Sequence, residues 1–165
     1  SVICGVDHPE HLVITPERDF FIAPQFGGIG PYVKIENRRT GQLSSINIVE
    51  QTVRDLEIRF SDNTWGDGIC ERPQDKLMEP HGIDLIQRRD GTYQLAVVNH
   101  YLGDRIEMFE LLSKDSSWIL VWRGCVRVPE VYYLNDISLS EDGSFYVSHM
   151  YHPEFTIFDL SLIHI

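Results

Sequence analysis

Residues 79–100 have the sequence Glu-Pro-His-Gly-Ile-Asp-Leu-Ile-Gln-Arg-Arg-Asp-Gly-Thr-Tyr-Gln-Leu-Ala-Val-Val-Asn-His. Two β-rich apolar runs flank Asp90-Gly91, a residue pair typical of hairpin turns. His81 and His100 stand at the outer ends of the two runs. If the runs pair as antiparallel strands, both histidines lie at the open end of the hairpin. The segment therefore predicts a hairpin that carries polar chemistry at one end.

The composition fits one globular domain with a hydrophobic core. The chain has 165 residues, of which 42% are hydrophobic and 11% aromatic. Its 25 acidic residues outnumber 14 basic ones, and the net charge is -11. Because this charge repels phosphates, neither nucleic acid nor an anionic membrane is an expected partner. No run approaches the roughly 20 apolar residues of a membrane span, and the first residues do not have the pattern of a signal peptide.

Several common kinds of site are excluded by spacing. Cys4, Cys70 and Cys125 lie far apart with no CxxC pair, so a structural zinc is not expected. One disulfide with one free thiol and three buried thiols both remain compatible with this pattern. The glycines of segment 27–30 do not have nucleotide-binding spacing and indicate a loop. No GxSxG motif occurs, which argues against a serine nucleophile.

Short β-rich runs follow one another along the chain, and none shows a sustained period of 3.6 residues. The sequence therefore predicts an all-β fold with low helix content. Strands are expected near residues 12–15, 20–23, 32–36, 42–49, 52–60, 79–86, 92–100, 105–111, 118–123, 137–139, 144–149 and 155–160. The alternation over 52–60 predicts a single strand with one buried face. Residues 61–80 are expected to form a long loop insertion, with Trp65 and Cys70 as packing anchors and a functional role such as a lid.

Three blocks of the chain repeat one pattern, in which polar residues precede an apolar strand, an acidic turn and a second strand. The blocks begin at Glu10, His81 and Asn135-Asp136. Each is expected to be an antiparallel meander, like a propeller blade of four strands in about 40–50 residues. Residues 1–165 are therefore predicted to form one β-propeller unit with about three blades. In a propeller the starts of the inner strands converge on one axis.

The residues at these strand starts have a recognisable chemistry. The side-chain oxygens of Glu10, Asn135 and Asp136 suit calcium. The imidazoles of His81 and His100 suit proton transfer, since free histidine titrates near pH ~6.5. Each residue also has an ordinary structural explanation: a hydrogen-bonded histidine at a strand end, an Asx turn, or a surface glutamate. For His149, at the end of the matching strand of the third block, a place at the same mouth and a purely structural role both remain open.

Taken together, four motifs resemble the paraoxonase/arylesterase family, and more distantly the gluconolactonase and strictosidine-synthase-like propellers. The motifs are Pro80-His81-Gly82-Ile83, Val97-Val98-Asn99-His100, Leu134-Asn135-Asp136-Ile137, and Glu10 before Leu12-Val13-Ile14. The resemblance covers nearly the whole chain. It implies a propeller of the six-bladed type with calcium ions in its tunnel, roughly half of which this chain supplies. It also implies a hydrolase of lactones and aryl esters, and favours a secreted or periplasmic location.

The resemblance assigns roles to individual residues. Glu10 and Asn135 match ligands of a catalytic calcium ion. Asp136 and the backbone carbonyl of Ile83 match ligands of a second, structural calcium ion. His81 matches the general base that activates water, and His100 matches the histidine that assists it.

Two departures from the family pattern shape the remaining expectations. His11 stands where the family has an aspartate, which weakens the expectation of the second calcium. Because about three blades do not close a ring, the chain is expected to be a fragment or to form a two-fold homodimer that doubles Glu10 and Asn135. The alternative function is a non-catalytic propeller, either a binding scaffold or an inactive fragment of such an enzyme.

Overall fold

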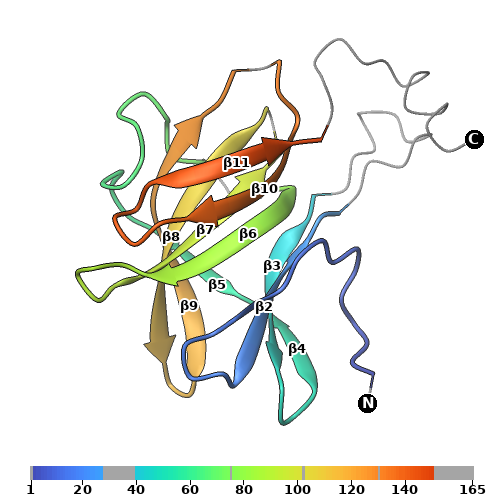
Figure 1. Cartoon of the computed structure of the whole chain (residues 1–165). Coiled ribbons are helices and arrows are strands. Elements are labelled where there is room, and N and C mark those ends of the chain that lie inside the picture. The colour runs from blue at the N-terminus through green and yellow to red at the C-terminus, as the bar shows by residue number, and fades with distance from the viewer. Residues whose placement is uncertain (1, 28–39, 75, 102, 130, 151–165) are drawn as a thin grey trace, which may run out of the picture.

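The computed structural model describes residues 2–27, 40–74, 76–101, 103–129 and 131–150. These residues form eleven strands in three sheets, with no helix among them (Figure 1). The all-β prediction is confirmed for this part of the chain. No described helix is long and apolar enough to cross a membrane. The described sheets do not close into a barrel, and the six-bladed propeller stays a prediction.

The first sheet is an antiparallel meander near the N-terminus. Its strands follow chain order: β1 (Val13–Ile14), β2 (Phe20–Gln25), β3 (Gln42–Asn47) and β4 (Thr52–Asp55). The predicted hairpin over residues 12–23 is confirmed by the pairing of Val13 with Ile22. The strand expected at 32–36 lies outside the described residues. The strand that pairs with β2 on its other side is β3.

The second sheet contains the hairpin predicted for residues 79–100. Its strands are β5 (Glu57–Phe60), β6 (Pro80–Gln87), β7 (Tyr93–Asn99), β8 (Arg105–Lys114) and β9 (Ser117–Arg127). The spatial order is β5-β9-β8-β7-β6, with β6 to β9 antiparallel and β5 parallel to β9. The third sheet pairs β10 (Leu134–Leu139) with β11 (Phe145–His149). The hairpin predicted for residues 79–100 is confirmed, and the pairs β8-β9 and β10-β11 form two further hairpins.

The single strand predicted over residues 52–60 is wrong, because the chain changes sheets at Leu56. Residues before it pair with β3, and residues after it pair in parallel with β9. The Leu56 N–H donates to the Leu43 carbonyl at 2.9 Å, and the Leu56 side chain enters the core at 7% exposure. Arg54 and Asp55 are consecutive exposed polar residues that interrupt the period of two just before Leu56, and the prediction of a single strand overlooked this interruption.

The repeat seen in the sequence recurs as one turn geometry after β1, β6 and β10. Arg18, Gly91 and Gly143 have positive φ values of 59°, 88° and 87°. Each donates its N–H to the carbonyl three residues earlier, at 2.9, 2.9 and 2.8 Å. In the last two turns the hydroxyl two residues after Asp90 or Asp142 donates to that carboxylate and lowers its pKa. The three blocks therefore share a local structure as well as a sequence pattern.

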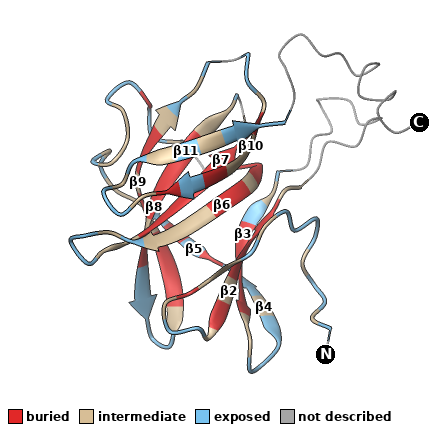
Figure 2. Cartoon of the chain, in the orientation of Figure 1, coloured by how far each residue is buried: buried red, intermediate tan, exposed pale blue. Residues whose placement is uncertain are grey.

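The second sheet is buried on both faces and supports the other two (Figure 2). One cluster of buried side chains, including Phe109 and Trp122, packs it against the first sheet. A second cluster, including Val98 and Leu134, packs it against β10 and β11. Alternate residues of β7 enter opposite clusters, which explains its continuous apolar run. The hairpin of β6 and β7 is thus the middle layer of the molecule.

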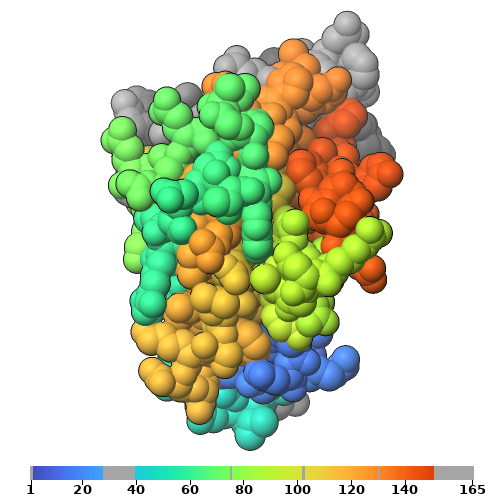
Figure 3. All heavy atoms as spheres, turned by 90° about the vertical axis from the view of Figure 1, so that its left-hand side faces the viewer, coloured from blue at the N-terminus to red at the C-terminus, as the bar shows by residue number. Residues whose placement is uncertain are grey.

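The segment between β5 and β6 is fixed against β9 (Figure 3). Cys70 forms a disulfide with Cys125 of β9, and Cys4 is an exposed free thiol, which settles the two alternatives left open by the sequence. The Asn63 side chain donates to the backbone carbonyl of Cys70 at 3.0 Å. The packing roles predicted for Cys70 and Trp65 are confirmed by their burial in or against the two clusters.

Candidate functional site

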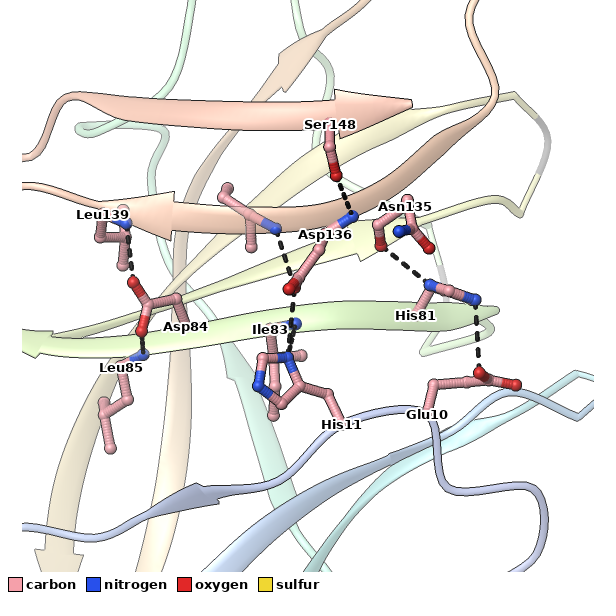
Figure 4. Close-up of polar contacts among 11 residues, drawn as sticks. Glu10, His11, His81, Ile83, Asp84, Leu85, Asn135, Asp136, Leu139 and Ser148 are labelled. Carbon is pink, nitrogen blue, oxygen red and sulfur yellow. Dashed lines mark hydrogen bonds and ion pairs between the residues drawn. The ribbon is translucent and has the colours of Figure 1, made fainter. Parts of the chain in front are cut away.

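The starts of β1, β6 and β10 converge although they belong to three different sheets. β6 contacts β10 on one side and β1 and β2 on the other (Figure 4). Between them lies a pocket of about 240 Å³, here called the entry pocket. It is lined by Glu10, His11, His81, Gly82, Asn135 and Asp136. The structure thus brings together four of the residues that the sequence singled out.

The close approach of β6 to β10 requires glycine at position 82. A Cβ atom placed there would lie 2.5 Å from the carbonyl oxygen of Asn135 and 2.5 Å from Oδ1 of Asp136. Real Cβ atoms essentially never come this close to other atoms. The missing side chain therefore sets how near His81, the neighbour of Gly82, comes to the backbone of β10.

The His81 ring is oriented by the backbone of β10. Its Nδ1 lies 2.8 Å from the Asn135 carbonyl oxygen, an atom that only accepts hydrogen bonds, so Nδ1 carries the proton and donates it. The other ring nitrogen, Nε2, lies 3.5 Å from Oε2 of Glu10. The side chain is 13% exposed. A neutral His81 therefore presents its lone pair on Nε2, on the side of the carboxylate of Glu10.

His11 joins the entry of β1 to the other two sheets. Its Nδ1 lies 3.2 Å from Oδ1 of Asp136 and 3.5 Å from the backbone nitrogen of Ile83. In an extended strand the N–H and C=O of one residue point to the same edge, so the Ile83 carbonyl also faces this side of β6. Asp136 Oδ1 additionally accepts the N–H of Ile137 at 2.9 Å. The imidazole of His11 thus stands beside both predicted ligands of the second calcium.

His100 lies behind His81 and does not line the entry pocket. The two ring centroids are 5.4 Å apart. Both histidines thus lie at the open end of the hairpin, as the sequence predicted. The His100 side chain is fully buried, and its Nδ1 is 2.8 Å from Oδ1 of Asp104. Tyr133 stacks on its ring at 4.2 Å with an interplanar angle of 5°, and Phe26 meets both histidines edge-on. The second histidine is held by aromatic and carboxylate neighbours.

Three neighbours of the histidines were missed from the sequence: Asp104, Tyr133 and Phe26. The available signals were an acidic residue four positions after His100 and an aromatic pair directly before β10. The second member of that pair, Tyr133, stacks on the ring of His100. His149 is exposed beside Tyr132 and is not among the residues of the entry pocket.

The donor chemistry of the entry pocket fits one hard cation. Glu10, Asn135 and Asp136 bring side-chain oxygens to the same pocket, and calcium prefers oxygen ligands. The second, structural calcium fits poorly, because the imidazole of His11 lies 3.2 Å from Oδ1 of Asp136, and calcium prefers oxygen ligands. Among the described residues, no group of three or more His, Cys, Asp or Glu is placed to hold a metal. Calcium therefore stays a proposal.

One oriented histidine, His81, lines the entry pocket beside the carboxylates of Glu10 and Asp136. A model of the Arylesterase family matches residues 10–163, and the chain belongs to this family. The family resemblance stated from the motifs is thereby confirmed. No relative was found among curated proteins. At the level of the family, membership supports a hydrolase of the esterase type.

The closeness of β6 and β10 leads to a test at Gly82. Because a methyl group there overlaps the backbone of Asn135 and Asp136, we expect Gly82→Ala to lower the free energy of unfolding by about 1–3 kcal/mol. Urea unfolding followed by circular dichroism measures the change. Gly68→Ala is the matched control, since nothing lies within 4 Å of a Cβ at that position. Equal stabilities of the two variants would contradict the steric argument.

Proposed function

We propose that this chain is a calcium-dependent hydrolase of lactones or aryl esters. The observation that carries the proposal is the entry pocket itself. In a member of the Arylesterase family, it places an oriented histidine, His81, beside the oxygen-bearing side chains of Glu10, Asn135 and Asp136. The propeller of the six-bladed type, with blades at the three sheets, is part of the same proposal. It is supported by the closeness of β1, β6 and β10, the first strands of the three blocks, and by the turn geometry that follows each of them.

His81 is proposed as the general base. Its Nδ1–H is held by the Asn135 carbonyl, so the lone pair of Nε2 is available to take a proton from water. The partner of Nδ1 is a backbone carbonyl, which does not titrate. The tautomer of His81 therefore does not depend on a second ionisable group. The deprotonated water then attacks the ester carbonyl. His100, 5.4 Å behind, supports the ring and is proposed to assist proton transfer.

Calcium would be held by Glu10 and Asn135, and it would polarise the ester carbonyl and stabilise the oxyanion. In this arrangement the carboxylate of Glu10, which lies 3.5 Å from Nε2 of His81, would serve as a calcium ligand. The family's second ion would need Asp136 and the Ile83 carbonyl. His11, 3.2 Å from Asp136, acts there as a direct cross-link between the strands and argues for a single ion.

The catalytic proposal is tested by turnover of phenyl acetate and a simple lactone, with and without a calcium chelator. We expect chelation to abolish turnover reversibly. Glu10→Gln, which removes a ligand charge, and His81→Gln, which removes the base, should each lower kcat by about 10²- to 10⁴-fold. Glu17→Gln, the same change on an exposed turn, is the matched control and should leave turnover unchanged.

The alternative is a non-catalytic propeller, acting as a binding scaffold or as an inactive piece of such an enzyme. The same assay separates the two functions. A correctly folded sample with no chelator-sensitive turnover of either ester would reject the hydrolase and favour the scaffold. Turnover that persists unchanged in Glu10→Gln would reject the proposed calcium site.

The single-ion proposal makes a prediction about stoichiometry. Isothermal titration calorimetry should give a single class of calcium site for the wild type, with one ion per chain, or one ion per two chains if a dimer shares the ion at its axis. His11→Asp replaces the imidazole beside Asp136 by oxygen ligands and should add a second, separable binding event. His149→Asp adds a carboxylate outside the entry pocket and should leave the wild-type stoichiometry unchanged. Two ions in the wild type, or no gain in His11→Asp, would contradict the role given to His11.

We also propose that two copies of the chain associate about a two-fold axis. Calcium takes about six to eight oxygen ligands, and a second copy would bring a second Glu10 and Asn135 to the axis. Multi-angle light scattering should then give a mass twice the 19.1 kDa of one chain. A folded monomer at micromolar concentration that still binds calcium would overturn this assembly and leave the remaining ligands to water.

A further inference from the structure

Asp104 makes two contacts that join separate parts of the site. It lies directly before β8, and its side chain is 9% exposed. Oδ1 is 2.8 Å from Nδ1 of His100, and Oδ2 accepts the N–H of Leu134 at 2.6 Å. Leu134 is the first residue of β10 and the immediate neighbour of Asn135. One buried carboxylate therefore holds both the second histidine and the strand that carries the polar pair.

We propose that Asp104 is the positioning residue of the site. An ionised carboxylate only accepts hydrogen bonds, so the proton of a neutral His100 is placed on Nδ1 and its lone pair on Nε2. The Asn135 carbonyl imposes the same tautomer on His81. Both histidines thus present Nε2 as the basic nitrogen, although their partners differ. The catalytic consequence of this arrangement rests on the proposed hydrolase function.

The ring of His100 is fixed in two independent directions. Asp104 holds it in its own plane through Nδ1, and Tyr133 covers its face at 4.2 Å with the planes 5° apart. Tyr133 and Leu134 are consecutive, so both restraints depend on the entry of β10. A displacement of that entry therefore changes the orientation of His100 as well as the place of Asn135.

The substitution Asp104→Asn removes the negative charge of the side chain and its ability to accept a hydrogen bond at each of two oxygens, but it keeps the packing. The amide keeps the size of the carboxylate, and its oxygen is required by the N–H of Leu134. Its NH2 group is then turned toward Nδ1 of His100. Because two donors do not pair, Nδ1 must become the acceptor and the ring proton must move to Nε2. The variant is expected to fold with the opposite tautomer of His100.

Long-range ¹H–¹⁵N NMR of the imidazole rings measures the tautomer without any turnover. Wild-type His100 should show protonated Nδ1, and Asp104→Asn should show protonated Nε2. Protonated Nε2 in the neutral wild-type ring overturns the proposal, whether or not the variant folds. An unchanged tautomer in a folded variant overturns it as well. Asp142→Asn is the control, because Asp142 likewise accepts two hydrogen bonds but lies in an exposed turn.

Steady-state kinetics supplies the functional readout. Asp104→Asn should lower kcat by about 10²- to 10⁴-fold with little change in KM, since the substrate contacts stay and only the tautomer is lost. Asp142→Asn should match the wild type. An active wild type with equally active Asp104→Asn rejects the positioning role. If the wild type does not turn over esters, the hydrolase function fails, and the NMR tautomers alone decide the role of Asp104.

Discussion

The structure depends on the contact of β6 with β10 at Gly82, where a Cβ atom would lie 2.5 Å from the backbone of Asn135. The two strands belong to different sheets and are not joined by a ladder of backbone hydrogen bonds. Side chains make the connections instead. Asp84 Oδ2 accepts the N–H of Leu139 at 2.7 Å, and His81 donates to the Asn135 carbonyl at 2.8 Å. The absence of a side chain at one residue thus brings two sheets within reach of short polar groups.

A buried network below the site fixes the open end of the hairpin that carries His100. Glu107 is 1% exposed and accepts hydrogen bonds from Trp122 Nε1 at 2.7 Å and from Asn99 Nδ2 at 3.0 Å. Arg105 lies against the same carboxylate, so the buried charge is paired. The Asn99 side-chain oxygen in turn accepts the N–H groups of Glu79 and Tyr101. The residues on both sides of His100 are therefore set by interactions inside the sheet.

Much of this fold follows from local sequence rules. Each Asp-Gly turn and each alternating run specifies a hairpin through its own residues, so the hairpins of residues 79–149 were predictable. The change of partner at Leu56 was not, because the polar pair Arg54-Asp55 interrupts the alternation without showing that the next strand pairs with β9. The Cys70–Cys125 pairing was not predictable either, since spacing alone leaves several connectivities open.

The residues of the candidate site likewise divide into those that the sequence could predict and those that it could not. Glu10, His81 and the Asn135-Asp136 pair could be predicted because the repeat places each at a strand start. Asp104 and Tyr133 belong to connections between strands, and their roles depend on a partner from another sheet. No pattern within either connection reports that partner. Sequence reasoning therefore found the residues that face the entry pocket and missed those that orient the residue behind it.

The polar contacts that tie other parts of the molecule to β10 around the entry pocket share one arrangement. His81 to Asn135, His11 to Asp136, and Asp104 to Leu134 each run from one sheet to the start of β10. Each tie ends on β10 within three consecutive residues, so β10 is the common reference for the groups that surround the pocket. Because these ties cross between sheets, the geometry of His81 and His100 is a property of the packing of three sheets. It follows that any change in how β10 sits against β6 alters the ligand residues and both histidines together, although no single sheet is distorted.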